Sequence, residues 1–404
     1  MAEFLDKLIV FDTNTNSYHY DWDEISKVPE FMVLKDCEQS PKWHSEGSVW
    51  NHTKAVCEVM QSDVINSDLY GCVSHFGMDE TLHYNDVNWY VKLLLTAALF
   101  HDIGKGTTTF EKDGEFHAYR HEFDGERITR LLLWDEGYRF RENVCELIRY
   151  HMDVLKVFDS KDPYIKIFTM SKNVCMNALL CLKYADCFGS KPTVENSHDI
   201  DKEKLSELYK ICRDTKCLWR HSEFITNGEY PWKKYKQNNK QKINLCVMIG
   251  LPGSGKDTYI HNALSNGNCS FLAGWNYSNT VVISRDDIRI DLGFCTNDEK
   301  IVGTKEQEIA VTKEFNTRIK AAAAKGKNII INNVNTRRKY RDYYKETLKE
   351  FNLNILYVYV ENCKLNDLIE RRKGQIPSCM YLPMILKFEW PANDEYNEFH
   401  IIHQ

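Results

Sequence analysis

The feature that most constrains this chain is the segment Gly250–Thr258, which reads Gly-Leu-Pro-Gly-Ser-Gly-Lys-Asp-Thr. It follows an apolar run and precedes a helix-like segment, which is the context that a GxxxxGK phosphate-binding loop requires. The glycines let backbone N–H groups converge on an anion, the helix N-terminus adds partial positive charge, and Lys256 reaches the outer phosphates. The expected contacts to a nucleoside triphosphate come from Gly250, Gly253, Ser254, Gly255, Lys256, Asp257 and Thr258.

Short strands and helices alternate in this part of the chain. The helix-like segment Lys305–Lys325 ends at Gly326. Apolar, β-branched runs typical of strands lie at Ile243–Gly250, Thr280–Ser284, Asn328–Asn332 and Asn354–Val360. Strands that alternate with helices predict an α/β fold with a parallel sheet.

The residues before the loop show helical rather than strand periodicity. Apolar side chains at helical spacing occur in Trp89–His101, Asp124–Glu136, Glu142–His151 and Lys172–Cys187. A polar, basic stretch at 233–242 separates the two regions. We therefore expect an α + α/β multidomain chain, with an all-α helical bundle over residues 1–232, a linker over 233–242, and an α/β domain with a parallel sheet over 243–404.

Charge and composition exclude several classes of protein. The 404 residues suffice for two or three domains of about 150 residues each. The 52 basic residues are outnumbered by 58 acidic ones, so no overall basic field attracts nucleic acid or an anionic membrane. Met1–Phe11 is charged where a secretory signal is apolar, and Leu93–Phe100 is far shorter than the ~20 residues of a membrane span. We expect no membrane partner, a cytoplasmic protein, and reduced cysteines packed in the core, such as Cys57, Cys175, Cys181 and Cys246.

The phosphate-binding loop departs from the usual pattern at Asp257, where a Ser or Thr hydroxyl normally binds Mg²⁺. A carboxylate beside a triphosphate is repulsive unless a cation lies between them. Asp257 is therefore a candidate metal ligand itself, directly or through water, and Thr258 is the other candidate.

The residues after the next two strands separate phosphoryl transfer from simple hydrolysis. Ser284-Arg285-Asp286-Asp287-Ile288-Arg289 places carboxylates at the sheet edge where ligands of α/β folds bind. Asp286 can act as a base toward an attacking hydroxyl, and Arg289 can hold a substrate phosphate. The alternative is a surface cluster that caps a helix. The amides Asn332 and Asn333 reach the same edge, and Arg371 and Arg372 lie on what would be a lid over the triphosphate.

These motifs resemble the 5′-kinase domain of phage polynucleotide kinase, in the same order and over residues 243–375. The resemblance implies ATP or another nucleoside triphosphate with Mg²⁺ as the donor. It implies Lys256 at the phosphates, Asp286 as general base, Arg289 on the acceptor phosphate, and Arg372 or, less directly, Arg371 on the donor. The family's usual Asp at the end of the third strand is Asn333 here.

Imidazoles and carboxylates recur at the ends of the predicted N-terminal helices. His101-Asp102 ends an apolar helix. This pair alone is weak evidence for a metal site, and the further histidines and the aspartate named below strengthen it. A mixed set of this kind suits Mn²⁺, Ni²⁺, Co²⁺, Fe²⁺ or Zn²⁺ and metal-assisted phosphoester hydrolysis. Each histidine alone is more often a surface or core residue, and His44 and His117 stay unassigned. The candidate set is His52, His101, Asp102, His121, His151 and Asp186.

The stretches Trp-His-Ser-Glu-Gly-Ser-Val-Trp-Asn-His, ending at His52, and His-Asp-Ile-Gly-Lys-Gly, starting at His101, resemble the HD phosphohydrolase superfamily. They look most like the HD domain attached to some tRNA nucleotidyltransferases, over residues 42–190. That resemblance implies activity on 2′,3′-cyclic and 2′-phosphate ends, and Lys105 at the scissile phosphate. His121 and His151 would hold a second metal or contact phosphate. The implied metal ligands are His52, His101, Asp102 and Asp186.

The two regions together resemble the bacterial and phage HD-type polynucleotide kinases. This implies a bifunctional enzyme of a bacterium or phage-infected cell that removes 2′,3′-cyclic, 2′- or 3′-phosphate from RNA or DNA ends. It would phosphorylate 5′-OH ends and prepare both for a separate RNA ligase. One alternative is a fusion of a nucleoside or nucleotide kinase with an HD nucleotidase. Another treats one region as a degenerate recruitment module, which Asp257 would admit.

Overall fold

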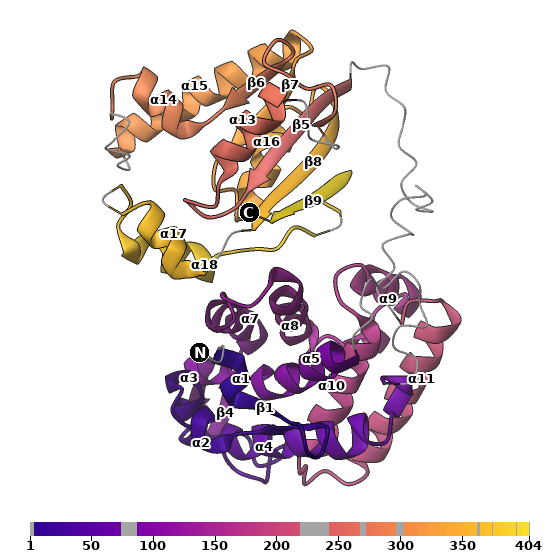
Figure 1. Cartoon of the computed structure of the whole chain (residues 1–404). Helices are drawn as coiled ribbons and strands as arrows, with labels where there is room; N and C mark the ends of the chain where they lie inside the picture. The colour runs from indigo at the N-terminus through magenta and orange to yellow at the C-terminus, as the bar shows by residue number, and fades with distance from the viewer. Residues whose placement is uncertain are drawn as a thin grey trace. The chain divides into compact units, whose positions relative to one another are not determined.

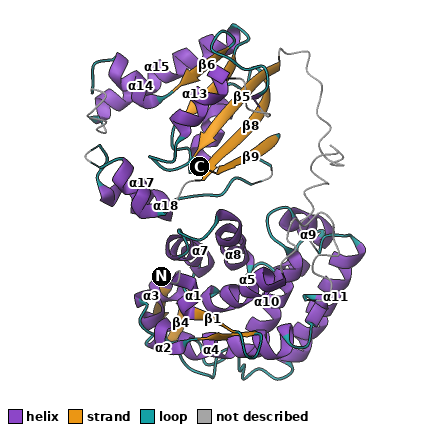
Figure 2. Cartoon of the chain, viewed as in Figure 1, coloured by secondary structure: helices purple, strands orange, loops and turns teal. Residues whose placement is uncertain are grey.

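The computed structural model describes residues 4–73, 87–218, 242–266, 272–295, 303–361, 364–373, 375–392 and 394–403. The chain divides into two compact units, Met1–Glu229 and Tyr230–Gln404. The first is mostly helical, and the strands of the larger sheet all belong to the second (Figure 2). The predicted linker at 233–242 lies outside the described residues, except that Lys242 begins a strand.

The first unit is built from helices that enclose one apolar core (Figure 1). Its α-helices are α1 Phe4–Leu8, α2 Trp22–Ile25, α3 Pro29–Met32, α4 Val49–Val59, α5 Val87–Phe100, α6 Lys105–Thr108, α7 His121–Leu132, α8 Tyr138–Tyr150, α9 Pro163–Ser171, α10 Met176–Gly189 and α11 Ser197–Asp214. The shorter or wider helical turns are η1 Val33–Lys35, η2 Met60–Ile65, η3 Leu69–Gly71 and η4 Leu155–Asp159.

Two antiparallel hairpins correct the expectation of an all-α unit. In the first, β1 Ile9–Asp12 pairs with β2 Ser17–Tyr20, and in the second, β3 Thr109–Lys112 pairs with β4 Glu115–Ala118. Each strand has four residues, too few for a period of two to stand out from helical spacing. The turns carry the local signal instead, because Asn16 and Asp113 adopt the left-handed conformation that such residues tolerate.

Helices α4 and α10 touch through their backbones. A Cβ at Gly189, the last residue of α10, would lie 2.7 Å from the backbone nitrogen of Val56 on α4. Only glycine fits this approach without a shift of one helix. The contact matters for function because α4 carries His52 and α10 carries Asp186.

The second unit contains a five-stranded parallel sheet in the order β6-β7-β5-β8-β9. Its strands are β5 Lys242–Ile249, β6 Thr280–Ile283, β7 Asn328–Asn332, β8 Asn352–Glu361 and β9 Glu398–His403. Its helices are α13 Lys256–Asn266, α14 Arg285–Asp291, α15 Lys305–Ala324, α16 Arg338–Thr347, α17 Leu365–Arg371, η6 Ser378–Met380 and α18 Tyr381–Leu386. The parallel α/β fold is confirmed.

The observed strands agree with the sequence to within a residue or two, except for β9, which was not expected. β9 is an edge strand with no fully buried side chain among those described, so its sequence lacks the apolar run of β5 or β7. The carboxyl ends of β5, β6 and β7 lead to the phosphate-binding loop, to α14 and to the amides of Asn332 and Asn333. Parallel strands therefore bring the predicted groups to one edge.

None of the described helices is by itself long and apolar enough to cross a membrane. Helices α9 and α10 taken together have the length and apolar composition of a membrane span, but the chain bends by 108° between them.

Candidate functional site

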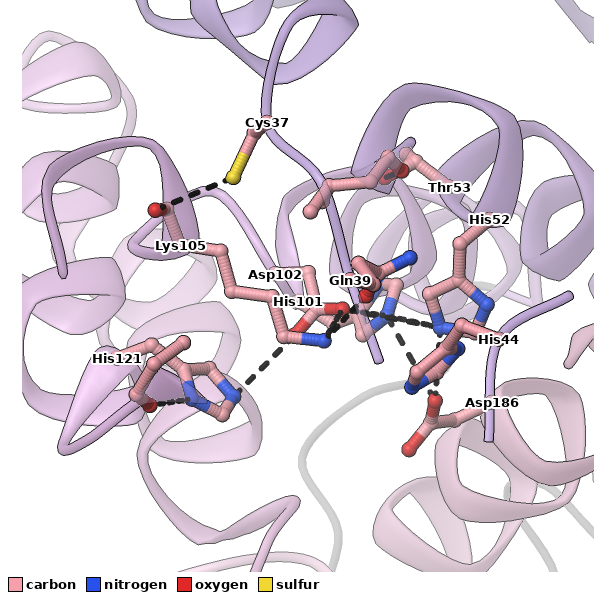
Figure 3. A network of polar contacts seen from close by, with 12 residues as sticks. Cys37, Gln39, His44, His52, Thr53, His101, Asp102, Lys105, His121 and Asp186 are labelled. Carbon is pink, nitrogen blue, oxygen red and sulfur yellow. Dashed lines mark hydrogen bonds and ion pairs between the residues drawn. The ribbon is translucent and has the colours of Figure 1, made fainter. Parts of the chain in front are cut away.

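The six histidines and aspartates predicted in the first unit converge in its interior. His52 lies on α4, His101 and Asp102 form the turn after α5, and the remaining three lie on or beside α7, α8 and α10. None is more than 9 % exposed. Their donor atoms form two groups, each within 4.8 Å: His52, His101 and Asp186 in one, and Asp102, His121 and His151 in the other. Figure 3 shows most of this cluster.

The first group places two imidazole nitrogens and one carboxylate oxygen around a common point. The Nε2 atoms of His52 and His101 are 3.3 Å apart. Asp186 Oδ1 lies 3.1 Å from the former and 3.8 Å from the latter. Two nitrogens and one oxygen that face one another in this way form a donor set that fits a divalent transition cation.

The second group repeats this arrangement. His121 Nε2 and His151 Nε2 are 3.3 Å apart, and Asp102 Oδ1 lies 3.2 Å from the first and 3.7 Å from the second. The other oxygen of Asp102 faces the first group, 3.3 Å from His101 Nε2. One carboxylate thus presents an oxygen to each group. This arrangement fits a pair of cations bridged by Asp102.

The orientation of the imidazoles supports metal binding over ordinary core packing. The Nδ1 atoms of His101, His121 and His151 lie 2.8, 2.8 and 2.6 Å from carbonyl oxygens three residues earlier. Donation from Nδ1–H to a carbonyl leaves the Nε2 lone pair directed at the cluster, as in metal-bound histidines. Asp102 Oδ2 is buried and lies 2.6 Å from Lys105 Nζ and 3.3 Å from His101 Nε2, so this oxygen already faces cationic and imidazole groups.

The electrostatics of the cluster favour positive charge at its centre. Burial disfavours the charged forms, but Lys105 and His101 outweigh it and hold the pKa of Asp102 well below its usual range. Lys183, 2.7 Å from Asp186, has the same effect on the pKa of that carboxyl. Burial also opposes the charge on His52, yet its bonds to Asp186 and Glu46 raise its pKa to about 9. A bound cation would therefore displace a proton from the cluster.

Three supporting residues were missed in the sequence analysis. Glu46 Oε1 lies 3.0 Å from His52 Nδ1 and orients that ring. Gln39 Oε1 accepts a 2.8 Å hydrogen bond from Lys105 Nζ, which places the lysine at the cluster. Lys183 balances Asp186. Glu46 lies in the motif that ends at His52, and Lys183 precedes Asp186 by one helical turn, so local spacing was the available signal.

Gly104 explains the glycine of the His-Asp-Ile-Gly stretch. A Cβ on this residue would lie 2.1 Å from the carbonyl oxygen of His121 and 2.5 Å from the nitrogen of Gly125. The turn after α5 therefore rests directly on the first turn of α7. This close approach brings Asp102 within reach of His121.

A cavity of about 550 Å³ opens onto the cluster. Asp102, His121, His151 and Asp186 line its floor, together with Lys105 and Lys183. Of the two histidines left unassigned, His44 lines this cavity and donates from Nδ1 to Glu46 Oε1 at 2.8 Å. His117 lines the cavity from β4. The candidate metal ligands are therefore reached through this cavity.

The second unit presents the phosphate-binding loop in the expected form. Gly253 and Gly255 have φ angles of +81° and +92°, which let the loop curl around an anion. Lys256 Nζ donates to the carbonyl oxygens of Gly250 and Leu251, at 2.8 and 2.9 Å, and lies 3.4 Å from Ser254 Oγ. Burial lowers the pKa of Lys256 to about 8.

Asp286 and Arg289 lie in the same cavity as Lys256, a space of about 760 Å³. Ser284 caps α14 by accepting from the backbone nitrogen of Asp286. Arg289 donates to Asp286 at 2.7 Å and to both oxygens of Glu308, at 2.7 and 3.0 Å. Glu308 was missed because it lies on α15, 19 residues away. The hydrogen bond from Arg289 is the main reason that the pKa of Glu308 falls to about 2.

Asp257 connects the loop to two other predicted elements. Its carboxylate accepts from Asn332 Nδ2 at 2.5 Å and from Arg372 Nη2 at 3.3 Å. Arg371 donates to the carbonyl oxygen of Gly253 at 3.3 Å, and Thr258 lines the cavity. The predicted lid arginines thus lie beside the loop.

Asn333 lines the cavity, and its side-chain amide also makes two contacts within the protein. Its Oδ1 accepts from the backbone nitrogen of Arg285 at 3.0 Å, and its Nδ2 lies 3.3 Å from the hydroxyl of Tyr344. An amide can make both contacts at once, because it carries an acceptor and a donor. Asn333 therefore holds the start of α14, which carries Asp286.

Comparison with known families identifies the two units separately. Residues 82–168 match the family model of the HD domain, and residues 245–380 match that of an AAA domain. The chain therefore combines an HD domain with a P-loop domain of the AAA type. His52 and Asp186 lie outside the matched HD residues, so it is the fold that brings them to His101.

Solved structures give weaker likenesses. A chain of the "Structure of Pnkp1/Rnl/Hen1 complex" is 23% identical, with a TM-score of 0.26, over 34% of this chain and 41% of that one. A chain of the "Structure of the Pnkp1/Rnl/Hen1 RNA repair complex" is 20% identical, with a TM-score of 0.30, over 38% and 46%. This chain thus matches less than half the length of either. The curated proteins gave no match.

Proposed function

We propose that this protein heals broken nucleic-acid ends with two independent sites. The HD domain would remove 2′,3′-cyclic, 2′- or 3′-phosphate from one end, and the P-loop domain would transfer phosphate from ATP to the 5′-hydroxyl of the other. The products, a 3′-terminal hydroxyl and a 5′-phosphate, are what a separate RNA ligase in the same cytoplasm would require.

The observation that carries the proposal is the content of the P-loop cavity. Lys256 shares that cavity with Asp286 and Arg289, which would serve as a base and an anion-binding group. A hydrolase needs only to place a water molecule, whereas a kinase needs to hold and deprotonate an acceptor. The presence of Asp286 and Arg289 beside the triphosphate loop therefore supports phosphoryl transfer to a hydroxyl.

In the kinase reaction, the loop amides and Lys256 would hold the β- and γ-phosphates, with Mg²⁺ held through Asp257 or Thr258. Asp286 would accept the proton of the attacking hydroxyl. The hydroxyl oxygen would bond to the γ-phosphorus while the bond between the γ-phosphorus and the oxygen that bridges it to the β-phosphate breaks. Arg372, now on Asp257, would turn to the donor phosphates. Arg289, fixed by Glu308, would hold the acceptor's phosphate.

In the phosphoesterase reaction, His52, His101, Asp102 and Asp186 would hold one cation, and His121 and His151 with Asp102 a second. A divalent transition ion supplies Lewis acidity toward a phosphoryl oxygen and toward water. Lys105 contacts Asp102 at the cavity and would attract the substrate phosphate as a point charge.

The test is a single oligoribonucleotide that carries a 5′-hydroxyl and a 2′,3′-cyclic phosphate, incubated with ATP and a panel of divalent ions. Mass spectrometry of the product should show a gain of phosphate at the 5′ end and hydrolysis at the 3′ end. Transfer of labelled phosphate to free nucleosides but never to the oligonucleotide would instead identify a nucleotide-metabolism enzyme. Unchanged ATP turnover in Lys256→Ala would identify the P-loop domain as a recruitment module.

A further inference from the structure

The β3–β4 hairpin carries three aromatic rings on one face. Phe110 and His117 are cross-strand partners, and Tyr119 follows two residues after His117 on the same side. The rings of His117 and Tyr119 are nearly parallel, at 14° and 5.3 Å between centroids, and Phe110 lies within 5.8 Å of both. The Tyr119 hydroxyl lies 3.4 Å from His117 Nδ1, a contact that keeps the two rings aligned.

This ring cluster is not part of the apolar core. Tyr119 is 65 % exposed, the highest value among the large hydrophobic side chains that the structure describes, and Phe110 is 42 % exposed. Rings left in water contribute little to folding by burial. A role in packing therefore does not account for them.

Two of the three rings line the cavity of the HD domain. His117 and Tyr119 line that cavity together with Asp102, His121 and His151. The backbone fixes the hairpin to the metal ligands, because the carbonyl of Ala118 lies 2.8 Å from His121 Nδ1. Tyr119 precedes His121 by two residues, so their Cα atoms are at most about 7 Å apart. The exposed ring and the candidate metal ligands thus line one cavity and are joined by a short stretch of backbone.

The other exposed aromatic of the cavity is less suited to hold a base. Trp43 is 46 % exposed against 65 % for Tyr119, and the group over its ring is the charged end of a long side chain, Lys42 Nζ, 5.0 Å from the centroid, rather than a second ring. Tyr119 is supported by His117 on one side. A ring supported on one side and exposed on the other is the arrangement on which unpaired bases stack in single-stranded nucleic-acid sites.

We infer that Tyr119, backed by His117, stacks on the base of the terminal nucleotide whose phosphate enters the cavity of the HD domain. This inference rests on the proposed function and extends it, since it makes an unpaired terminal nucleoside the unit that is recognised. A terminal base that is paired in a duplex offers only its outer face and is held in place by its partner, whereas an unpaired base is free to turn onto the ring. The site therefore selects single-stranded or frayed ends without reading a particular base.

The test uses the full chain and a short oligoribonucleotide that ends in 2-aminopurine with a 2′,3′-cyclic phosphate. Its 5′-hydroxyl is replaced by hydrogen, so that it is no kinase acceptor. Binding is measured by fluorescence quenching with no divalent ion added, and hydrolysis is measured separately with the ion panel. A matched oligonucleotide with an abasic terminal ribose carries no fluorophore, so it is used in the hydrolysis assay alone, where it shows how much of the KM depends on the base.

Tyr119→Ala should weaken binding and raise KM about tenfold for the base-bearing end, with the value for the abasic end and kcat unchanged. Tyr119→Phe keeps the ring and should behave as wild type. Tyr164→Ala is the matched control, because Tyr164 is 59 % exposed in the same unit but does not line the cavity. An equal loss on both substrates, no loss, or a loss in Trp43→Ala instead would overturn the inference.

The two proposals fail in different ways. Wild-type protein that quenches 2-aminopurine through Tyr119 but hydrolyses no end would refute the phosphoesterase and support the base stack. Hydrolysis that is the same for abasic and base-bearing ends, in wild type and Tyr119→Ala, would support the phosphoesterase and refute the base stack. Thermal unfolding of each variant identifies any that lose activity through misfolding.

Discussion

Because of Lys256, the affinity for nucleotide should fall as the pH rises, by an amount that follows from the pKa of this lysine. Its pKa in the nucleotide-free protein is about 8 because the ammonium group is buried. Triphosphate binds the charged form, so binding above pH 8 requires the lysine to take a proton from solvent. The apparent Kd rises as 1 + 10^(pH − 8), which is ~1.1 at pH 7 and ~11 at pH 9. The structure therefore predicts about a tenfold loss of affinity over these two pH units.

The assay is titration calorimetry of Mg²⁺-ATP at several pH values, each in buffers of different ionisation enthalpy. Proton uptake on binding should be about 0.5 per chain at pH 8 and about 0.9 at pH 9. Lys256→Arg is the control, because a guanidinium stays charged throughout this range. A Kd that is constant from pH 7 to pH 9, or a slope that is equal in Lys256→Arg, would refute the reasoning.

Three further predictions concern the separate sites. Asp286→Ala should lower phosphate transfer about 10²–10⁴-fold in a labelled-ATP assay while sparing hydrolysis of a 2′,3′-cyclic end. Asp102→Ala should do the reverse and reduce bound Mn²⁺, measured by mass spectrometry of the metal, to at most one ion per chain; loss of both activities in either variant would contradict separate sites. Gly104→Ala should lower the free energy of unfolding by about 1–3 kcal/mol in thermal melts, because its Cβ would overlap the His121 carbonyl; an unchanged melt would contradict that packing.

The parts of the fold that sequence could predict were those with strong local patterns. The buried strands β5, β6, β7 and β8 and the long helix α15 followed from apolar runs and periodicity. The four-residue strands of the first unit did not, because hairpins of that length depend on the surface they pack against. The edge strand β9 lacked an apolar run for the same physical reason, since an edge strand is only half covered.

The parts of the site that the sequence could predict were those made of chemically distinctive residues. Histidines and aspartates at helix ends predicted a cluster, and the structure brings them together in the interior of the first unit; that they bind a metal stays a prediction. Glu46, Lys183 and Glu308 escaped notice because acidic and basic side chains are common, and only the fold shows which of them faces a ligand. The contacts of Asn333 likewise depend on Arg285 and Tyr344, which no spacing rule connects to it.

The candidate metal ligands connect parts of the chain that are far apart in sequence, since His52 and Asp186 are 134 residues apart. An ion held between them would tie α4 to α10 and, through Asp102, to the turns beside α7 and α8. Metal supply would then govern how long the HD domain survives proteases in a cell, in addition to its turnover. Limited digestion with and without a chelator would show this, with cleavage spreading into the helices of the first unit when the metal is withdrawn.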